Sequence, residues 1–419
     1  MILARLKENG VEDKLWRTQF GFRSGCGTRD AIFIARRLIE QCHNCRNQHV
    51  VFLALDWAKA FDSIDPRCLV AALRRFGLPE QYLNIIASIY SERHFVVADN
   101  SHPSSAHRQF FGISQGCPLS PFLFVMLMTV LLHDAREKLE NDHGIILSPT
   151  ECNELIYADD TLLVGAHASS LQQYMNCIAA VGKEYGLSLN LTKLEQLNVN
   201  INEAQIYDAS GGLIQAKASI KYLGAQLKAD GHIESEIMQK IGVASREFDN
   251  LRRIWNHCHI SQQFKFTVFT ACVVQKLLYS LECSWLNKAM LKKIDGFYAR
   301  CLRKIIKVSP SFISRVSNQF VLQQFRAVPL SKILFQRQLC LFGRIARLPD
   351  EHMIRQLVFD PGSTNISQLE FRKRGRPRNT WATEVSKLAL QAVQGKDMST
   401  IVRNKESWER LVKQFGRSM

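Results

Sequence analysis

The first half of the chain mixes apolar runs of strand length with longer stretches of helical periodicity. Residues 50–56, VVFLALD, form a continuous apolar run that ends in an aspartate. This pattern is typical of a central strand that is buried on both faces. Two apolar runs over 154–164 flank a pair of aspartates and predict a hairpin. Shorter strands are expected near 93–98, 108–111, 195–200 and 220–227.

Helices are predicted between these strands. Asp65 followed by Pro66 is typical of a helix start, and Gly77 is typical of its end. Further helices are expected over about 79–91, 119–140 and 169–185. The 11-residue apolar block 122–132 is shorter than the roughly 20 residues of a bilayer span. It therefore predicts a core helix and a protein without a membrane partner.

The pattern changes after about residue 230. From 234 to 347 apolar residues recur at helical spacing, with few turn signals before Ser309 and Pro310. The last segment is more polar and begins with a loop rich in Asp, Pro, Gly and Ser. We therefore predict an α+β region over 1–230, a helical region over 231–349 and a small basic region over 350–419.

Composition and charge narrow the class of protein. With 46% hydrophobic and 22% charged residues, the 419-residue chain has the composition of a globular protein. Its net charge of +16 predicts a polyanionic partner such as nucleic acid. Thirteen Lys and Arg stand against five Asp and Glu over 235–307, which fits a nucleic-acid surface or simply a solvated helix face. Twelve scattered cysteines favour reduced thiols and an intracellular protein.

The candidate chemistry lies in the hairpin sequence LIYADDTLLV. Asp159 and Asp160 are adjacent, and aspartate is also a common turn residue that needs no further role. Both arms are apolar, however, and like charges near a core repel unless a cation lies between them. Asp56 supplies a third carboxylate at a strand end. If the strands are antiparallel neighbours, the carboxylates converge on a site for two Mg²⁺ ions, with Mn²⁺ as a substitute.

Four blocks extend this picture. In order they are QFGFRSG over 19–25, LDWAKAFD over 55–62, GISQGCPLSP over 112–121 and YADD over 157–160. Together they resemble the reverse transcriptase domain of non-LTR (LINE-type) retrotransposons over roughly 10–345. They are more distantly similar to group II intron reverse transcriptases. The resemblance implies a right-hand polymerase palm with partial fingers and a helical thumb. It also implies an RNA-directed DNA polymerase that uses an RNA template, a DNA primer and dNTP.

The resemblance also implies roles for single residues. The catalytic, metal-binding aspartates of the family match Asp56, Asp159 and Asp160. Its steric gate, which excludes ribonucleotides, matches Phe61, a residue that otherwise reads as plain core. Its glutamine beside the incoming nucleotide matches Gln115.

Two basic residues are further candidates for nucleotide binding. Lys193 matches a family lysine near the nucleotide phosphates, although it also reads as a solvated surface charge. Arg23 positions template or nucleotide, or forms an ion pair with a loop acid. The segment KYLG over 221–224 resembles the family's primer grip.

The chain also departs from the family pattern. No endonuclease or upstream finger strands precede the QFGFR block, and no cysteine follows Cys340 to form a Cys/His knuckle. We therefore expect an N-terminally truncated element protein. The alternatives are a catalytically inactive remnant that binds nucleic acid and, less in keeping with the tail, an intron maturase.

The C-terminal segment FRKRGRPR carries three further candidates, Arg374, Arg376 and Arg378. Its RGRP core matches an AT-hook, whose arginines enter a narrow A·T minor groove. It also reads as a basic linker or a nuclear localisation signal. We expect a nuclear protein, with a cytoplasmic ribonucleoprotein as the alternative, and the sequence leaves the oligomeric state open.

Overall fold

The computed structural model describes residues 1–419 except 100–101, 149–150, 369–371, 374, 376–377 and 419. The chain forms two compact units, and the division falls inside helix α2 (Thr28–Asn44). Unit 1 comprises residues 1–31 and 47–229, and unit 2 comprises 32–46 and 230–419. The segment 350–419 thus belongs to the same unit as the helical region before it.

Unit 1 is built around a five-stranded sheet in the order β6-β7-β1-β8-β9. The central strand β1 (Val50–Leu55) is antiparallel to both neighbours, β7 (Asp160–Gly165) and β8 (Glu195–Val199). Strand β6 (Glu154–Tyr157) forms a hairpin with β7 at one edge, and β9 (Ala216–Lys217) lies parallel to β8 at the other. Five of the six β1 residues are buried, in agreement with the continuous apolar run.

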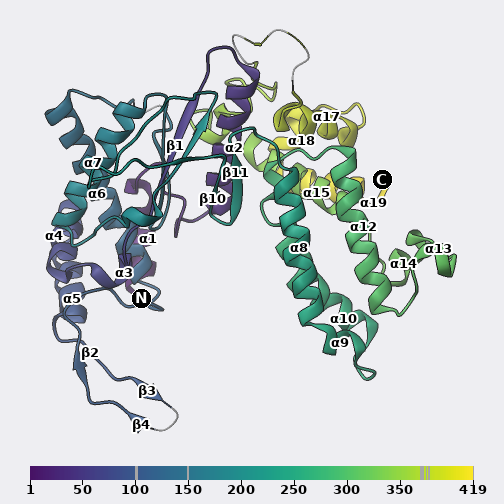
Figure 1. Cartoon of the computed structure of the whole chain (residues 1–419), viewed down its shortest axis with the longest axis horizontal. Coiled ribbons are helices and arrows are strands. Elements are labelled where there is room, and N and C mark those ends of the chain that lie inside the picture. Colours follow the sequence, from purple (N-terminus) through teal and green to yellow (C-terminus); the bar gives the residue numbers. More distant parts are fainter. Residues whose placement is uncertain (100–101, 149–150, 369–371, 374, 376–377, 419) are drawn as a thin grey trace. The chain divides into compact units, whose positions relative to one another are not determined.

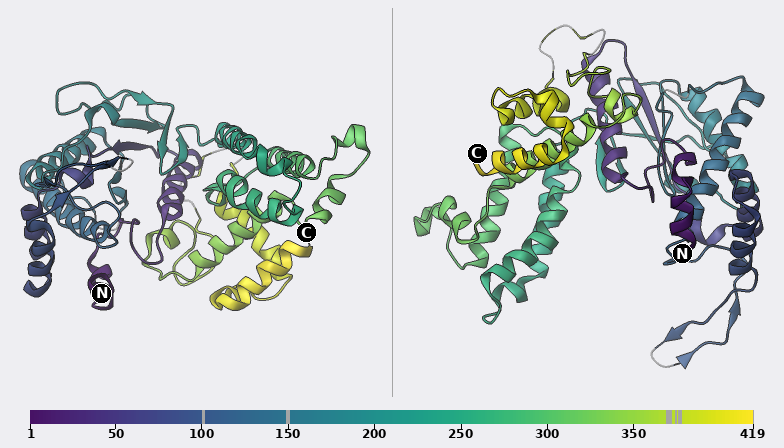
Figure 2. Two further views of the ribbon diagram at one scale, coloured as in Figure 1. Left: turned by 90° about the horizontal axis from the view of Figure 1, so that it is seen from below. Right: turned by 180° about the vertical axis from the view of Figure 1, so that it is seen from behind.

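Helices cover this sheet and complete the predicted α+β architecture. Helices α6 (Ser120–His143) and α7 (Ala168–Glu184) lie side by side and share one core with the sheet (Figures 1 and 2). Helix α4 (Pro66–Phe76) packs on α6 and on α5 (Glu80–Ser91). The other elements of unit 1 are α1 (Ile2–Glu8), η1 (Val11–Lys14), α3 (Ala60–Ser63), η2 (Leu191–Lys193) and the hairpin of β10 (Ser219–Tyr222) and β11 (Ala225–Lys228).

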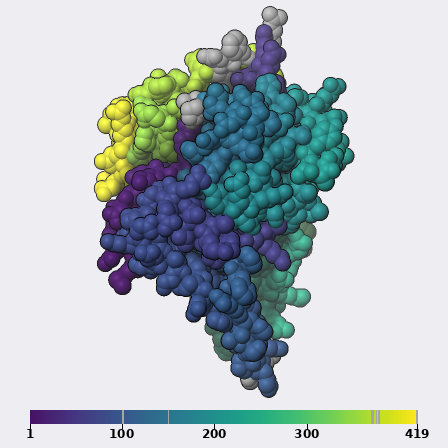
Figure 3. All heavy atoms as spheres, turned by 90° about the vertical axis from the view of Figure 1, so that its left-hand side faces the viewer, coloured from purple at the N-terminus to yellow at the C-terminus, as the bar shows by residue number. Residues whose placement is uncertain are grey.

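A narrow arm projects from unit 1 between α5 and α6 (Figures 1 and 3). In it β2 (His94–Phe95) pairs with β5 (His107–Arg108), and β3 (Ala98–Asp99) pairs with β4 (His102–Pro103). All described residues from 94 to 108 are exposed. The sequence predicted two longer strands here. Because neither face of the ribbon is packed, only two short ladders form.

Unit 2 is helical. Its core includes residues of α8 (Glu234–Asn250), α12 (Lys288–Ile305) and α15 (Leu330–Ala346), and α12 contributes the most. The others are α9 (Arg252–Asn256), α10 (Gln262–Phe269), η3 (Thr270–Val274), α11 (Gln275–Leu278), η4 (Leu281–Cys283), α13 (Ser311–Ser314), α14 (Asn318–Gln324), α16 (Met353–Gln356), α17 (Trp381–Val393), α18 (Met398–Arg403) and α19 (Lys405–Ser418). The polar tail predicted for 350–419 is therefore largely helical.

One stretch of unit 2, Gln262–Cys283, has the length and apolar composition of a membrane-spanning helix. Its side chains Phe269, Val273, Leu277 and Leu281 are all fully buried in the core of unit 2. This is the packing of a core helix, and length and composition alone are weak evidence for a membrane span. The absence of a membrane partner stays a prediction.

Candidate active site

Two strands of unit 1 end at the same place and carry the three predicted aspartates. Leu55 at the end of β1 pairs with Thr161 in β7. One residue beyond this pair, Asp56 leaves β1 beside Asp160, where β7 begins. Asp159 directly precedes Asp160 and lies in the hairpin turn between β6 and β7. The convergence that the sequence predicted from neighbouring antiparallel strands is present in the structure.

The turn that carries Asp159 is under backbone strain. It has two central residues, Ala158 and Asp159, between the paired Tyr157 and Asp160. Ala158 has a φ of 59°. A positive φ at the first central residue is typical of a type II′ turn, where glycine is usual because a side chain is strained there. An alanine at this position has to be held by its surroundings.

Burial and neighbouring negative charge make Asp159 and Asp160 harder to ionise. Burial raises the pKa of Asp159, and the nearby Asp56 raises it further, against two backbone hydrogen bonds that lower it. Asp160 lies in the exposed rim, yet partial desolvation by the surrounding protein and the charges of Asp159 and Asp56 raise its pKa as well. Such a group of carboxylates favours a cation beside it.

Lys193 supplies one such cation. Its Nζ lies 3.1 Å from Asp56 Oδ2, and 62% of its side chain is exposed. Backbone hydrogen bonds hold its segment in place, because Asn190 donates to the Asp56 carbonyl and Ala58 donates to the Ser188 carbonyl, both at 2.8 Å. The structure thus brings Lys193 to the aspartates, while its contact with nucleotide phosphates stays a prediction.

The second and third sequence blocks meet at Phe61 and Gln115. The half-buried Phe61 ring stacks on Phe124 of α6, with centroids 4.8 Å apart and planes 16° apart. Gln115 Nε2 donates to Asp62 Oδ1 at 3.1 Å. Gly112 permits this approach, because a Cβ there would lie 2.9 Å from Asp62 Cα. Phe61 is therefore a core contact with one side left open, and its role as a gate stays a prediction.

Arg23 lies in a separate hollow of unit 1. It lines a cavity of about 300 Å³ with Lys7, Phe22 and two prolines of the third block, Pro118 and Pro121. Its side chain has no hydrogen bond or ion pair with any described residue. The alternative of an ion pair with a loop acid is therefore not seen within the described ranges, and nucleotide or template binding stays a prediction.

The basic C-terminal segment is described only in part. Arg374 and Arg376 lie outside the described residues. Arg378 donates from its backbone to Asn44 Oδ1 at 3.2 Å and from its guanidinium to the Asp230 carbonyl at 2.7 Å. These contacts tie this end of the segment to unit 2. Binding to a DNA groove stays a prediction for all three arginines.

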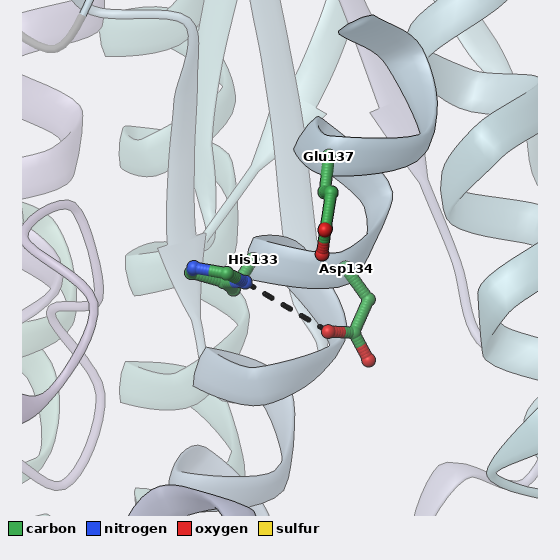
Figure 4. Close-up of side chains that lie close together, drawn as sticks. All are labelled: His133, Asp134 and Glu137. Atoms are coloured by element: carbon green, nitrogen blue, oxygen red, sulfur yellow. Dashed lines mark ion pairs between the residues drawn. The ribbon is translucent and has the colours of Figure 1, made fainter. Parts of the chain in front are cut away.

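A different cluster has the ligand spacing of a metal site. His133, Asp134 and Glu137 on α6 place one ligand atom each within 4.8 Å of one another (Figure 4). Asp134, however, already accepts hydrogen bonds from Arg75 at 2.6 Å and from the Tyr185 hydroxyl at 2.7 Å. We interpret the cluster as part of this polar network on α6.

Gln19 has no role predicted from the sequence, yet it contacts the turn of Ala158 and Asp159 directly. Its Oε1 accepts a hydrogen bond from the backbone N–H of Ala158 at 3.0 Å. The two residues are 139 positions apart in the chain. The only signal for this contact was the place of Gln19 at the head of the QFGFR block.

Comparisons with known proteins agree with this geometry. The reverse transcriptase (RNA-dependent DNA polymerase) family matches residues 1–227. A Pol polyprotein from retrotransposable element R2 of Popillia japonica is 27% identical over 321 residues, 73% of this chain and 43% of that protein. A Pol polyprotein from R2 of Nasonia vitripennis is 32% identical over 143 residues, 34% of this chain and 14% of that protein. The chain thus spans less than half the length of these relatives.

Among solved structures, apo telomerase from Candida tropicalis covers 98% of this chain and 60% of its own at 13% identity. The TM-score of 0.41 is too low to bear on fold or function. The family match rests instead on more than half of the chain, and its range includes unit 1 up to residue 227 with the three aspartates. The chain therefore belongs to the reverse transcriptase family, in the group carried by non-LTR retrotransposons.

Proposed function

We propose that this chain is itself an RNA-directed DNA polymerase that adds deoxynucleotides to the 3′-hydroxyl of a DNA primer on an RNA template. The observation that carries the proposal is the meeting of Asp56 with Asp159 and Asp160 at one end of the unit 1 sheet. Because the chain belongs to the reverse transcriptase family, we assign these three carboxylates to a catalytic, metal-binding site.

Divalent ions fit the donor set. The site offers carboxylate oxygens from two strands, and burial and mutual repulsion raise the pKa of Asp159 and Asp160. Among the described residues, the three aspartates do not form a group with ligand atoms all within 4.8 Å of one another. Mg²⁺ takes few protein carboxylates together with water and phosphate oxygens, so this donor set fits it. When bound, two Mg²⁺ or Mn²⁺ ions activate a 3′-hydroxyl and stabilise the leaving pyrophosphate.

We assign the contacts with the ions, the nucleotide phosphates and the sugar to different residues of the site. Asp56, which directly follows β1, and Asp159, in the hairpin turn, would hold the ions, and Asp160 at the start of β7 would add negative charge beside them. Lys193, which is exposed and pairs with Asp56, would contact the nucleotide phosphates if ions occupied its place beside Asp56. Phe61 closes the space beneath the sugar.

Two polar side chains complete the nucleotide site. Gln115 lies against the incoming nucleotide and its template base. The guanidinium of Arg23, which has no hydrogen-bond or ion-pair partner among the described residues, holds a phosphate of the nucleotide or the template.

The partners are an RNA template, a DNA primer and dNTP. The net charge of +16 supports binding to these polyanions, and the segment 235–307 of unit 2 carries thirteen Lys and Arg against five Asp and Glu. We propose that the protein acts in the nucleus, because the DNA that it would extend lies there.

The proposal is tested by extension of a DNA primer on a defined RNA template by the purified chain in Mg²⁺. We expect products that grow only with complementary dNTP and stop where one dNTP is left out. A chain that binds the primer–template duplex tightly but adds no nucleotide in Mg²⁺ or Mn²⁺ would be the inactive remnant. That result would overturn the proposal.

A further inference from the structure

The turn of Ala158 and Asp159 is held by the buried side chain of Gln19, the first residue of the QFGFRSG block. Gln19 is 1% exposed, and its Oε1 accepts hydrogen bonds from the backbone N–H of Ala158 at 3.0 Å and of Gly21 at 2.8 Å. Because both partners are donors, the oxygen of the amide must face them and the nitrogen cannot. One acceptor atom therefore joins the first block to the turn that presents Asp159.

The backbone of Gln19 is fixed against the strand that leads into the turn. Gln19 forms a parallel bridge with Ile156 in β6. Phe20 donates to the Ile156 carbonyl at 2.8 Å, and Ile156 donates to the Thr18 carbonyl at 3.0 Å. These hydrogen bonds fix the backbone of Gln19 relative to the β6–β7 hairpin. The Gln19 side chain therefore has a fixed position from which it contacts the turn.

Gly21 brings the two segments into direct contact. A Cβ at this position would lie 2.6 Å from the Ala158 nitrogen and 3.1 Å from the Tyr157 carbonyl carbon. Any larger residue would have to displace the turn or the first block. The close approach and the shared acceptor are two separate observations on the same contact.

We propose that Gln19 is a positioning residue that sets the direction of Asp159. Ala158 has a φ of 59°, a conformation that alanine adopts only under strain. The hydrogen bond from its N–H to Gln19 holds the residue there, and the next side chain in the chain is that of Asp159. This inference rests on the proposed function, and it assigns Gln19 a role in placing the metal-binding carboxylate, with no contact to substrate.

The experiment compares Gln19→Met with Gln19→Glu. Methionine keeps the length of the side chain but loses the acceptor, so the turn loses its anchor. We expect kcat for single-nucleotide extension to fall about 10- to 100-fold, since a misplacement of about 1 Å can cost about 100-fold. The dNTP KM and the duplex Kd should stay within about threefold. Glutamate keeps an acceptor oxygen, so Gln19→Glu should retain activity within about fivefold of the wild type.

A second readout does not depend on extension. Mg²⁺ should raise the Tm of the wild type and of Gln19→Glu, and it should raise the Tm of Gln19→Met clearly less. Gly21→Ala should behave like Gln19→Met, because its Cβ would crowd both the Ala158 nitrogen and the Gln19 acceptor oxygen. The surface variant Glu203→Gln, at an exposed position, is the matched control.

The outcomes separate this inference from the proposed function. If the wild type does not extend primers, the proposed function fails, and the Mg²⁺-induced shift in Tm still decides the role of Gln19. If Gln19→Met matches the wild type in both readouts, or if Gln19→Glu is impaired as strongly as Gln19→Met, the inference is wrong. A lower Tm of Gln19→Met without Mg²⁺, together with an unchanged kcat, would show that Gln19 only stabilises the fold. That result would also overturn the inference.

Discussion

At the scale of single residues, ionised Asp159 and Asp160 oppose folding when no metal ion is bound. The folded-state pKa of Asp159 is raised, mainly by burial. A carboxyl with a raised folded pKa contributes stability that is fully present below its unfolded pKa of about 3.9. That contribution is lost as the pH rises through the folded pKa. At neutral pH without divalent ions, ionised Asp159 therefore lowers the free energy of unfolding.

Asp159→Asn should accordingly raise the Tm at pH 7.5 in the presence of EDTA. The difference from the wild type should shrink as the pH approaches 4, because the wild-type carboxyl then takes up its proton. Adding Mg²⁺ should raise the Tm of the wild type more than that of the variant. Thermal unfolding of both proteins over this pH range is the measurement. A variant that melts below the wild type at pH 7.5 would show that the carboxylate is a stabilising group.

Phe61 offers a second residue-scale prediction. Its ring is half-buried on Phe124, so Phe61→Val keeps an apolar side chain and opens space on the exposed side. If the ring excludes a 2′-hydroxyl by a clash, the ratio of kcat/KM for dNTP over rNTP should fall at least about tenfold. Extension with dNTP should stay within about fivefold.

The matched control is Phe110→Val, on the exposed arm of unit 1, where 66% of the side chain surface is accessible. It should leave the ratio of kcat/KM for dNTP over rNTP unchanged. An unchanged ratio in Phe61→Val as well would assign Phe61 to the core alone and place the sugar selection elsewhere.

At the scale of elements, the parts nearest the site were the ones that the sequence predicted well. Strand β1 follows from an unbroken apolar run, and helix α4 follows from its end signals. The Asp65 side chain accepts from the N–H of Arg67 at 2.8 Å, and Gly77 ends the helix with a φ of 98°. Each of these signals is local, so no tertiary contact is needed to interpret it.

Helix α2 was not predicted, because its pattern depends on distant partners. Residues 31–35 are buried, as in a strand or core helix, but two buried arginines follow them directly. Arg36 is paired with Glu236 at 2.7 Å, and Arg37 donates to the Cys283 carbonyl at 2.9 Å. These partners are 200 and 246 residues away. The charges interrupt the apolar stripe in the sequence and are satisfied only in the folded unit. The contact of Gln19 with the turn was hidden for the same reason.

The C-terminal region gives the element-scale prediction. Trp381 at the start of α17 is fully buried. Its ring lies edge-on to Phe33 with centroids 4.7 Å apart, and its indole N–H donates to the Glu282 carbonyl at 2.7 Å. Trp381→Ala should therefore lower the free energy of unfolding of unit 2 by about 3–5 kcal/mol.

Leu390 on the same helix is 54% exposed and provides the control. Leu390→Ala should change the free energy of unfolding by less than about 0.5 kcal/mol, as is usual for surface positions. Denaturant unfolding of the three proteins is the measurement. Equal stability of Trp381→Ala and Leu390→Ala would show that the segment after residue 350 folds independently of the rest of unit 2.

At the scale of the whole molecule, the excess of 16 positive charges makes binding to nucleic acid dependent on salt. Replacing both Arg374 and Arg376 by Ala should reduce the slope of log K against log salt by about one to two units. If the segment enters a minor groove, A·T-rich duplex should lose more affinity than G·C-rich duplex. Titrations by fluorescence anisotropy at several salt concentrations measure both effects.

The control removes the same charge from α4, where Arg67 and Arg74 have exposed side chains. The double variant Arg67→Ala and Arg74→Ala should leave the salt slope nearly unchanged. Equal slopes for both double variants would mean that the C-terminal arginines do not contact nucleic acid. Equal losses of affinity for A·T-rich and G·C-rich duplex would mean that Arg374 and Arg376 contact only the phosphates.

The central claim is that carboxylates from two strands hold the ions that drive templated extension by this chain. The most direct test is the rate of single-nucleotide addition on a preformed complex with an RNA template and a DNA primer, measured over a range of Mg²⁺ concentrations. The wild type should show a saturating dependence on Mg²⁺. Asp159→Asn should lower the rate at least about 1,000-fold, since several kcal/mol of catalysis depend on the bound ions. Its duplex Kd should stay within about twofold. A variant that extends within about threefold of the wild-type rate would contradict the account.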